Sequence, residues 1–194
     1  MIQEHKGKRL FITGIPASGK SYLAKTLAEK TDGIAVALDG LRMNFLKDDR
    51  YKQWILFYFN QDEAKYLTQT HPDELWNNVV RQSEELWPIF LNGIEQYKNE
   101  TRPVIFECVN LLPHIAKREL YFPGLVMLGD SFETILDRNK KDPRWGKTEE
   151  LQELEVKEFF YVHRPRYKLE AEKYGYLTFE HYQDALQEGS RLLV

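Results

Sequence analysis

Residues 11–21 read Phe-Ile-Thr-Gly-Ile-Pro-Ala-Ser-Gly-Lys-Ser. This stretch matches the pattern G-x-x-x-x-G-K-[ST], in which every fixed position helps to hold a phosphate group. The two glycines permit turns that direct backbone N–H groups inward. The lysine reaches the β- and γ-phosphates, and the final serine offers a hydroxyl to Mg²⁺. The stretch therefore predicts a nucleoside triphosphate site formed by Gly14, Ile15, Pro16, Ala17, Ser18, Gly19, Lys20, Ser21 and Tyr22.

The residues on either side of this loop supply the structural context that such a site needs. Arg9 to Thr13 form a short apolar run typical of a buried strand, and Tyr22 to Lys30 carry apolar residues at helical spacing. Strand, glycine loop and helix follow in the required order, and the positive end of the helix dipole faces the phosphate. The pattern alone also permits an ordinary strand-to-helix turn that contains glycines.

Composition indicates one globular domain over residues 1–194, with 42% hydrophobic and 29% charged residues. The formal net charge of −3 argues against broad nucleic-acid binding, which uses an excess of cations. No stretch approaches 18 apolar residues, and the N-terminus lacks an apolar signal core. The single cysteine, Cys108, excludes an internal disulfide. We expect a cytoplasmic protein with no membrane partner.

Four more nearly continuous apolar runs resemble strands covered on both faces. Because helical patterns separate them, we expect a five-stranded parallel sheet in an α/β fold. These runs are Ile34 to Leu38, Pro103 to Phe106, Leu125 to Leu128 and Tyr176 to Phe179. Ligands of such sheets lie beyond the carboxyl ends of the strands. That rule selects Gly14, Asp39, Glu107, Asp130 and Glu180.

The crossover between the second and third strands is too long for one helix, so residues 41–102 are expected to form a helical insertion that binds the acceptor. Its later part, Asp73 to Lys98, has helical periodicity, and Pro88 should kink or split that helix. Its earlier part, Tyr51 to Leu67, is rich in aromatic residues. These rings either pack the insertion onto the sheet or line an acceptor pocket.

After the fourth strand, Ser131 is a good N-cap for a helix. Residues 138–147 hold five cations and one acid, and they form either a solvated loop or a lid whose arginines close over the phosphates. Thr148 to Lys173 is a helical stretch that Pro165 should kink or interrupt. Tyr182 to Leu193 is expected to form a closing helix.

Phosphoryl transfer requires positioned groups and charge neutralisation, usually with a carboxylate near the acceptor. Asp39 suits the role of base, and Arg42, one turn later, could hold an acidic group of the acceptor. The alternative is that Asp39 caps a helix. Glu107 would serve a Mg²⁺-bound water or contact Lys20, or else make a structural hydrogen bond.

Other cations complete the expected site. Lys20, Arg138 and Arg144 would stabilise the transferred phosphoryl group, although either arginine could be an ordinary surface cation. Asn110, His114 and Arg118 follow the third strand and could contact the acceptor.

These motifs resemble those of small P-loop kinases, the group that includes adenylate, shikimate, gluconate and adenylylsulfate kinases. The loop at 14–21 resembles theirs, and Leu-Asp-Gly-Leu-Arg at 38–42 resembles the acceptor-side Asp and Arg of several members. Residues 104–113 are similar to a strand and loop of 2-phosphoglycerate kinases, with Cys108 in place of a Gly and Asn110 in place of a His. The resemblance implies the three-layer P-loop NTPase fold, with an insertion after the second strand and a lid after the fourth.

The sequence thus predicts an ATP- and Mg²⁺-dependent phosphotransferase, with Ser21 and Glu107 at the metal. It would move the γ-phosphoryl group to a hydroxyl or phosphate of a nucleoside, nucleotide, sugar acid or phosphorylated hydroxy acid. One alternative is a P-loop ATPase or GTPase that acts as a switch or hydrolase. Another is a kinase of a nucleic-acid or tRNA-linked end.

Overall fold

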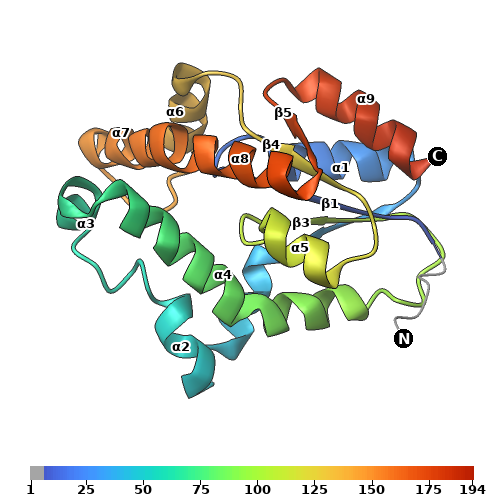
Figure 1. The fold of residues 1–194 in the computed structure, drawn as a ribbon, viewed down its shortest axis with the longest axis horizontal. Coiled ribbons are helices and arrows are strands. Elements are labelled where there is room, and N and C mark those ends of the chain that lie inside the picture. The colour runs from blue at the N-terminus through green and yellow to red at the C-terminus, as the bar shows by residue number, and fades with distance from the viewer. Residues whose placement is uncertain (1–6) are drawn as a thin grey trace.

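The computed structural model describes residues 7–194, so the first six residues of the N-terminal segment lie outside the described part. A five-stranded sheet with strand order β2-β3-β1-β4-β5 forms the centre, and every neighbouring pair is parallel (Figure 1). Each strand lies where the sequence predicts it, and its bounds differ by no more than one residue. The strands are β1 (Arg9–Gly14), β2 (Ile34–Ala37), β3 (Val104–Glu107), β4 (Gly124–Met127) and β5 (Leu177–Phe179). The predicted α/β class is confirmed.

The register of the central strand brings the predicted site together. β1 lies between β3 and β4, with Ile12 opposite Glu107 and Gly14 opposite Met127. The N–H of Leu38 donates to the carbonyl of Glu107 at 3.0 Å, just where β2 ends. The carboxyl ends of three strands and the loop after β1 therefore meet at one edge of the sheet.

Helices cover both faces of the sheet and give three layers. Leu10 and Ile12 of β1 face a core shared with α1 (Lys20–Lys30) and α9 (Tyr182–Leu193). Phe11 faces the opposite core, built with α4 (Pro72–Glu95), α5 (Pro113–Glu119) and α8 (Arg164–Tyr174). Because alternate residues of each strand are buried on opposite faces, the strands read as continuous apolar runs. Among residues 7–194, no helix has the length and apolar character needed to cross a membrane.

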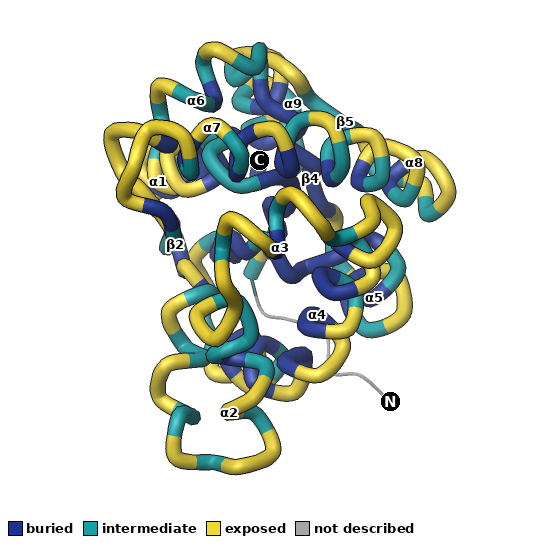
Figure 2. Tube along the Cα trace, turned by 90° about the vertical axis from the view of Figure 1, so that its left-hand side faces the viewer, coloured by how far each residue is buried: buried dark blue, intermediate teal, exposed yellow. Residues whose placement is uncertain are grey.

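The long crossover contains the 3₁₀-helix η1 (Asp39–Phe45), α2 (Asp49–Ile55), α3 (Glu63–Gln69) and α4. Pro88 lies inside α4 without dividing it, so the predicted split does not occur. The half of α4 that follows Ser83 buries Leu86, Phe90 and Ile94 in the core against the sheet, and this packing holds the helix together. By contrast, most residues of α2 are exposed (Figure 2).

The chain after β4 begins as predicted, because the Ser131 hydroxyl accepts the Thr134 N–H at 3.2 Å at the start of α6 (Phe132–Lys141). α7 (Glu149–Lys157) then continues into a π-helical turn, η2 (Glu158–His163), which leads into α8. Pro165 explains the interruption, since proline has no N–H with which to continue α-helical bonding. The Arg164 N–H bonds the Phe159 carbonyl five residues back.

Candidate active site

The phosphate loop connects β1 to α1 and takes the backbone shape that its glycines permit. Gly14 and Gly19 have φ of 127° and 95°, which side chains disfavour. A Cβ on Gly14 would lie 2.0 Å from the Met127 carbonyl oxygen, so only glycine fits against β4 here. α1 then begins at Lys20, and within the described chain no side chain caps its first turn. Its N-terminal N–H groups can therefore bind an anion.

Lys20 is buried at the base of this loop, where its ammonium donates to the Ile15 carbonyl at 2.7 Å. Burial and, to a lesser extent, the positive charge of Arg144 lower the pKa of Lys20 to about 8. The carboxylates of Glu107 and Asp39 oppose this shift. A bound phosphate would add negative charge beside the ammonium and raise its pKa again.

Nucleotide binding should therefore be coupled to proton uptake by Lys20. At a pH of about 9 the free lysine is mostly neutral and the phosphate-bound lysine is charged, so close to one proton is taken up per ATP. Below a pH of about 7 the free lysine is already charged, and this uptake disappears. Titration calorimetry in buffers of different ionisation enthalpy measures the proton count. Lys20→Arg is the control, because arginine stays charged; equal uptake in that variant would contradict the assignment.

Ser21 and Glu107 meet beside Lys20. The Ser21 hydroxyl donates to Glu107 Oε1 at 3.0 Å, and burial raises the pKa of Glu107 while Lys20 opposes that rise. Mg²⁺ in nucleotide sites takes few protein ligands, because phosphates and waters complete its octahedron. No cluster of three or more His, Cys, Asp or Glu side chains suited to a metal occurs in residues 7–194. The hydroxyl and carboxylate pair fits Mg²⁺ held jointly with a nucleotide.

Asp39 follows β2 and begins η1, but Leu38 and not Asp39 occupies the N-cap position. The carboxylate Oδ1 of Asp39 instead accepts a hydrogen bond from the Cys108 thiol at 3.1 Å. Burial, and then the charge of Asp39, raise the pKa of Cys108 well above its usual value, so the thiol stays a donor. Cys108 is fully buried in the core, and its thiol also holds the carboxylate of Asp39.

The two arginines predicted for the lid lie in different elements. Arg138 belongs to α6, where its guanidinium donates to the Ala17 carbonyl at 3.4 Å and to Asp130 Oδ2 at 3.2 Å. It therefore lies over the phosphate loop. Arg144 is exposed in the segment between α6 and α7. The basic stretch 138–147 is thus a helix end followed by a loop.

Two cavities open at the phosphate loop. The first, the phosphate cavity, has a volume of about 190 Å³ and is lined by residues including Gly19, Lys20, Ser21, Tyr22 and Arg138. The second, the aromatic cavity, has a volume of about 160 Å³, and its rings come from Tyr58, Phe59, Trp145, Phe159 and Tyr167. Pro16 of the loop and Arg42 also line the aromatic cavity, and Arg144 lines both. A nucleotide and a second molecule could therefore meet at Arg144.

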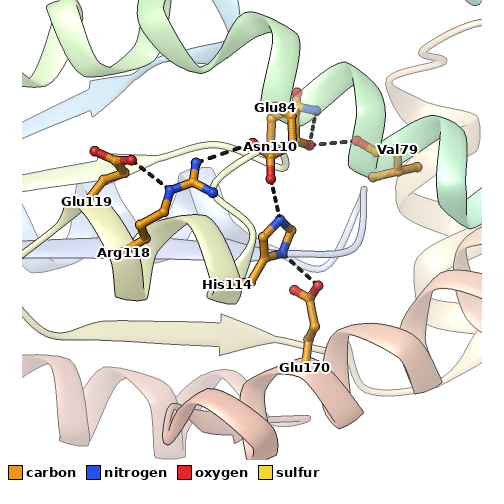
Figure 3. Close-up of polar contacts among 8 residues, drawn as sticks. Val79, Glu84, Asn110, His114, Arg118, Glu119 and Glu170 are labelled. Carbon is orange, nitrogen blue, oxygen red and sulfur yellow. Dashed lines mark hydrogen bonds and ion pairs between the residues drawn. The ribbon is translucent and has the colours of Figure 1, made fainter.

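Arg118, predicted to bind substrate, lines neither cavity in the described structure. It lies on α5 and pairs with Glu84 and Glu119 (Figure 3). His114, on the same helix, lies between Glu84 and Glu170 (Figure 3).

Asn110, Glu180 and Asp130 were predicted near the site only because they follow the ends of strands. Of these, Asn110 lines the aromatic cavity. Glu180 pairs with Arg164 at 2.9 Å, and Asp130 holds Arg138. The sequence did not single out Gln82, Glu158 or His163, which line the same cavity. For Glu158 and His163 the nearby signal was Pro165, which marks the break before α8, whereas Gln82 lies on α4.

No protein-family model matches the chain, and no curated protein has a matching sequence. Solved structures do match. TT1252 from Thermus thermophilus is 16% identical, with a TM-score of 0.56 over 97% of this chain and 96% of that one. A shikimate kinase from Acinetobacter baumannii, solved with shikimate, is 13% identical, with a TM-score of 0.53 over 94% and 90%. A deoxyadenosine kinase from M. mycoides, solved with dATP, is 14% identical, with a TM-score of 0.51 over 93% and 96%. The chain has the fold of the small P-loop kinases.

Proposed function

We propose that this protein transfers the γ-phosphoryl group of Mg²⁺-bound ATP to a small molecule. The observation that carries the proposal is the junction of the two cavities at Arg144. The phosphate cavity suits the triphosphate, and the aromatic cavity suits an acceptor whose reacting group faces it. The solved kinases of the same fold act on small molecules by their names, which supports the proposal.

Residues that line the cavities and residues beside them share the roles in this reaction, and within the described structure Asp39 and Glu107 line neither cavity. Asp39 takes the proton of the acceptor hydroxyl, whose oxygen forms a bond to the γ-phosphorus as the bond to the leaving ADP oxygen breaks. Lys20, Arg138 and Arg144 hold the charged oxygens of the transferred group. Ser21 and Glu107 would hold Mg²⁺, which would supply neutralisation of the phosphate charge. The rings around the aromatic cavity exclude water from the acceptor.

The proposal predicts that purified protein releases ADP slowly from Mg²⁺ and ATP, and that one class of small-molecule acceptor speeds this release sharply. Pools of nucleosides, nucleotides, amino alcohols, sugar acids and phosphorylated hydroxy acids would be tested in a coupled assay. Lys20→Ala, which loses the buried ammonium, provides the inactive control. ADP release unaffected by every pool, with phosphate appearing at the same rate, would identify a hydrolase instead.

A further inference from the structure

The helical insertion packs against α7 and the segment before it (Figure 1). That segment, residues 142–148, connects α6 to α7 and carries Arg144, which lines both cavities. Its Trp145 ring contacts the rings of Tyr58 and Tyr66 of the insertion, with centroids 5.8 Å and 5.9 Å away. Tyr58 and Trp145 line the aromatic cavity, so the position of the segment shapes that cavity.

Gly146 is the point at which two carboxyl groups meet this segment. Its N–H donates to Glu155 Oε1, while Glu155 Oε2 accepts from the Asn139 amide at 3.0 Å. A Cβ on Gly146 would lie 2.4 Å from Glu63 Oε1 and 3.1 Å from Glu155 Oε1, so both oxygens lie against the same glycine. Glu63 begins α3, and Glu155 lies on α7. The segment is therefore held between the insertion and α7.

The two carboxyl groups also contact each other. Glu63 and Glu155 are within hydrogen-bond reach, and Glu63 Oε1 is buried without a hydrogen-bond donor among the described residues. An ionised carboxylate only accepts hydrogen bonds, whereas a protonated carboxyl also donates one. Because two negative charges in contact repel, one proton remains between a pair of carboxyl groups that share a site.

Within residues 7–194, no positive charge takes the place of this proton, and Glu155 is the charged group that acts on Glu63. Burial, and then the contact with Glu155, raise the pKa of Glu63 to about 7, and the Gly146 N–H opposes this rise. Charged side chains on the neighbouring helices pair with one another: Lys140 with Glu149, Lys157 with Glu153, and Glu158 with His163.

We propose that Glu63 and Glu155 share one proton, and that this shared proton holds the insertion against the segment and so positions Arg144 at the junction of the two cavities. Both glutamates are positioning residues, because they act through Gly146 and not on a reacting atom. The shared proton does not depend on the phosphotransfer proposed above, but its effect on turnover rests on that proposal.

The proposal determines how the contact responds to pH. The ordinary pKa of a glutamate is 4.5, and in the closed contact the pKa of Glu63 is about 7. Closing the contact therefore takes up a proton between these two pKa values, and closure weakens by up to about tenfold per pH unit across that range. Below the range the open carboxyl is already protonated, and above it closure takes up no proton. The closure equilibrium is constant on both sides.

Hydrogen exchange of the Gly146 N–H, followed by NMR, measures closure, because this N–H is bonded within the contact. Its protection in the wild type should fall by about tenfold or more between a pH of about 5 and a pH of about 7, and then level off. Glu63→Gln should keep its protection constant over this range, since its amide donates to Glu155 with no proton to lose. Constant protection in the wild type, or an equal fall in Glu63→Gln, would overturn the proposal.

Glu153→Gln is the matched control, because Glu153 is exposed on α7 and pairs with Lys157. It should show the pH dependence of the wild type, and thermal unfolding checks that each variant folds. The wild type alone provides a second test, in which ¹³C NMR of the Glu63 side-chain carboxyl should give a pKa of about 7. An ordinary pKa of 4.5 would contradict the shared proton even if Glu63→Gln does not fold.

Acceptor kinetics test whether the contact positions Arg144. The kcat/KM of the wild type divided by that of Glu63→Gln should fall by about tenfold across the same pH range, because only the closed contact is competent. The division cancels the titration of Lys20 and of the nucleotide, which both proteins share. A ratio that stays constant would show that the pair does not position Arg144.

The exchange measurement needs no turnover, so the two proposals fail separately. Protection that depends on pH as expected, without acceptor-stimulated ADP release, would end the phosphotransfer proposal and keep the shared proton. Acceptor-stimulated release together with constant protection would do the reverse.

Discussion

If Arg144 contacts the transferred phosphoryl group as proposed, the Arg144→Ala variant is expected to lose about a thousandfold or more in kcat with the acceptor found in the ADP assay. Arg144 is the side chain that lines both cavities, and its charge reaches Lys20, whose pKa it lowers. Because it is exposed, its removal should leave the fold intact. Steady-state kinetics and calorimetric ATP binding measure the two effects, and ATP affinity should change far less than kcat.

Lys147→Ala is the control for this result. Lys147 is exposed in the same segment, and within the described structure it lines neither cavity. Its kcat and ATP affinity should equal those of the wild type. The comparison therefore shows whether an effect of Arg144→Ala comes from the position of Arg144 or only from the loss of a positive charge. Equal kcat in Arg144→Ala and wild type would show that the junction is not where the phosphoryl group passes.

The second large effect is expected for Asp39→Asn, which should lower kcat by about a hundredfold to ten-thousandfold, the usual contribution of a general base. The amide has nearly the same shape as the carboxylate but does not take up the hydroxyl proton. Binding of ATP and acceptor should therefore change little. Calorimetry measures binding, and rapid-quench kinetics measure the chemical step, so an effect on binding can be told from an effect on the reaction.

Variants at Cys108 and Asp49 accompany this test. Cys108→Ala removes the thiol that donates to Asp39, so it should lower kcat by a smaller factor, while Cys108→Ser keeps a donor and should restore most of it. Asp49→Asn changes an exposed aspartate on α2 and should have no effect. Full turnover in Asp39→Asn would assign the base elsewhere.

The sequence predicted the parts of the site that are contiguous. The phosphate loop is specified by residues 14–21 alone, because one strand, one turn and one helix contain all of its groups. The positions of Asp39 and Glu107 followed from a general rule about parallel strands, since apolar runs mark where the strands end. The roles of these residues in catalysis remain predictions.

The aromatic cavity could not be predicted in the same way. It brings together residues from α2, α4, the loop after β3, the segment after α6 and η2, and their contacts depend on packing between distant elements. The same reason explains why Arg118 lies away from both cavities, although it follows the end of a strand in the sequence. Pro113 starts a helix there, and the helix turns Arg118 toward Glu84 and Glu119. The sequence around Cys108 likewise does not indicate that Asp39 lies beside it.

The π-turn at Glu158–His163 makes the aromatic cavity sensitive to chain length as well as to residue type. Deleting one residue from this segment would restore ordinary helical winding and turn everything on its far side by about 100° relative to α7. Such a deletion could keep glutamate and histidine both present and still separate them. Relatives that differ by one residue in this segment would therefore be expected to differ in the molecule they accept, even where their cavity side chains are the same.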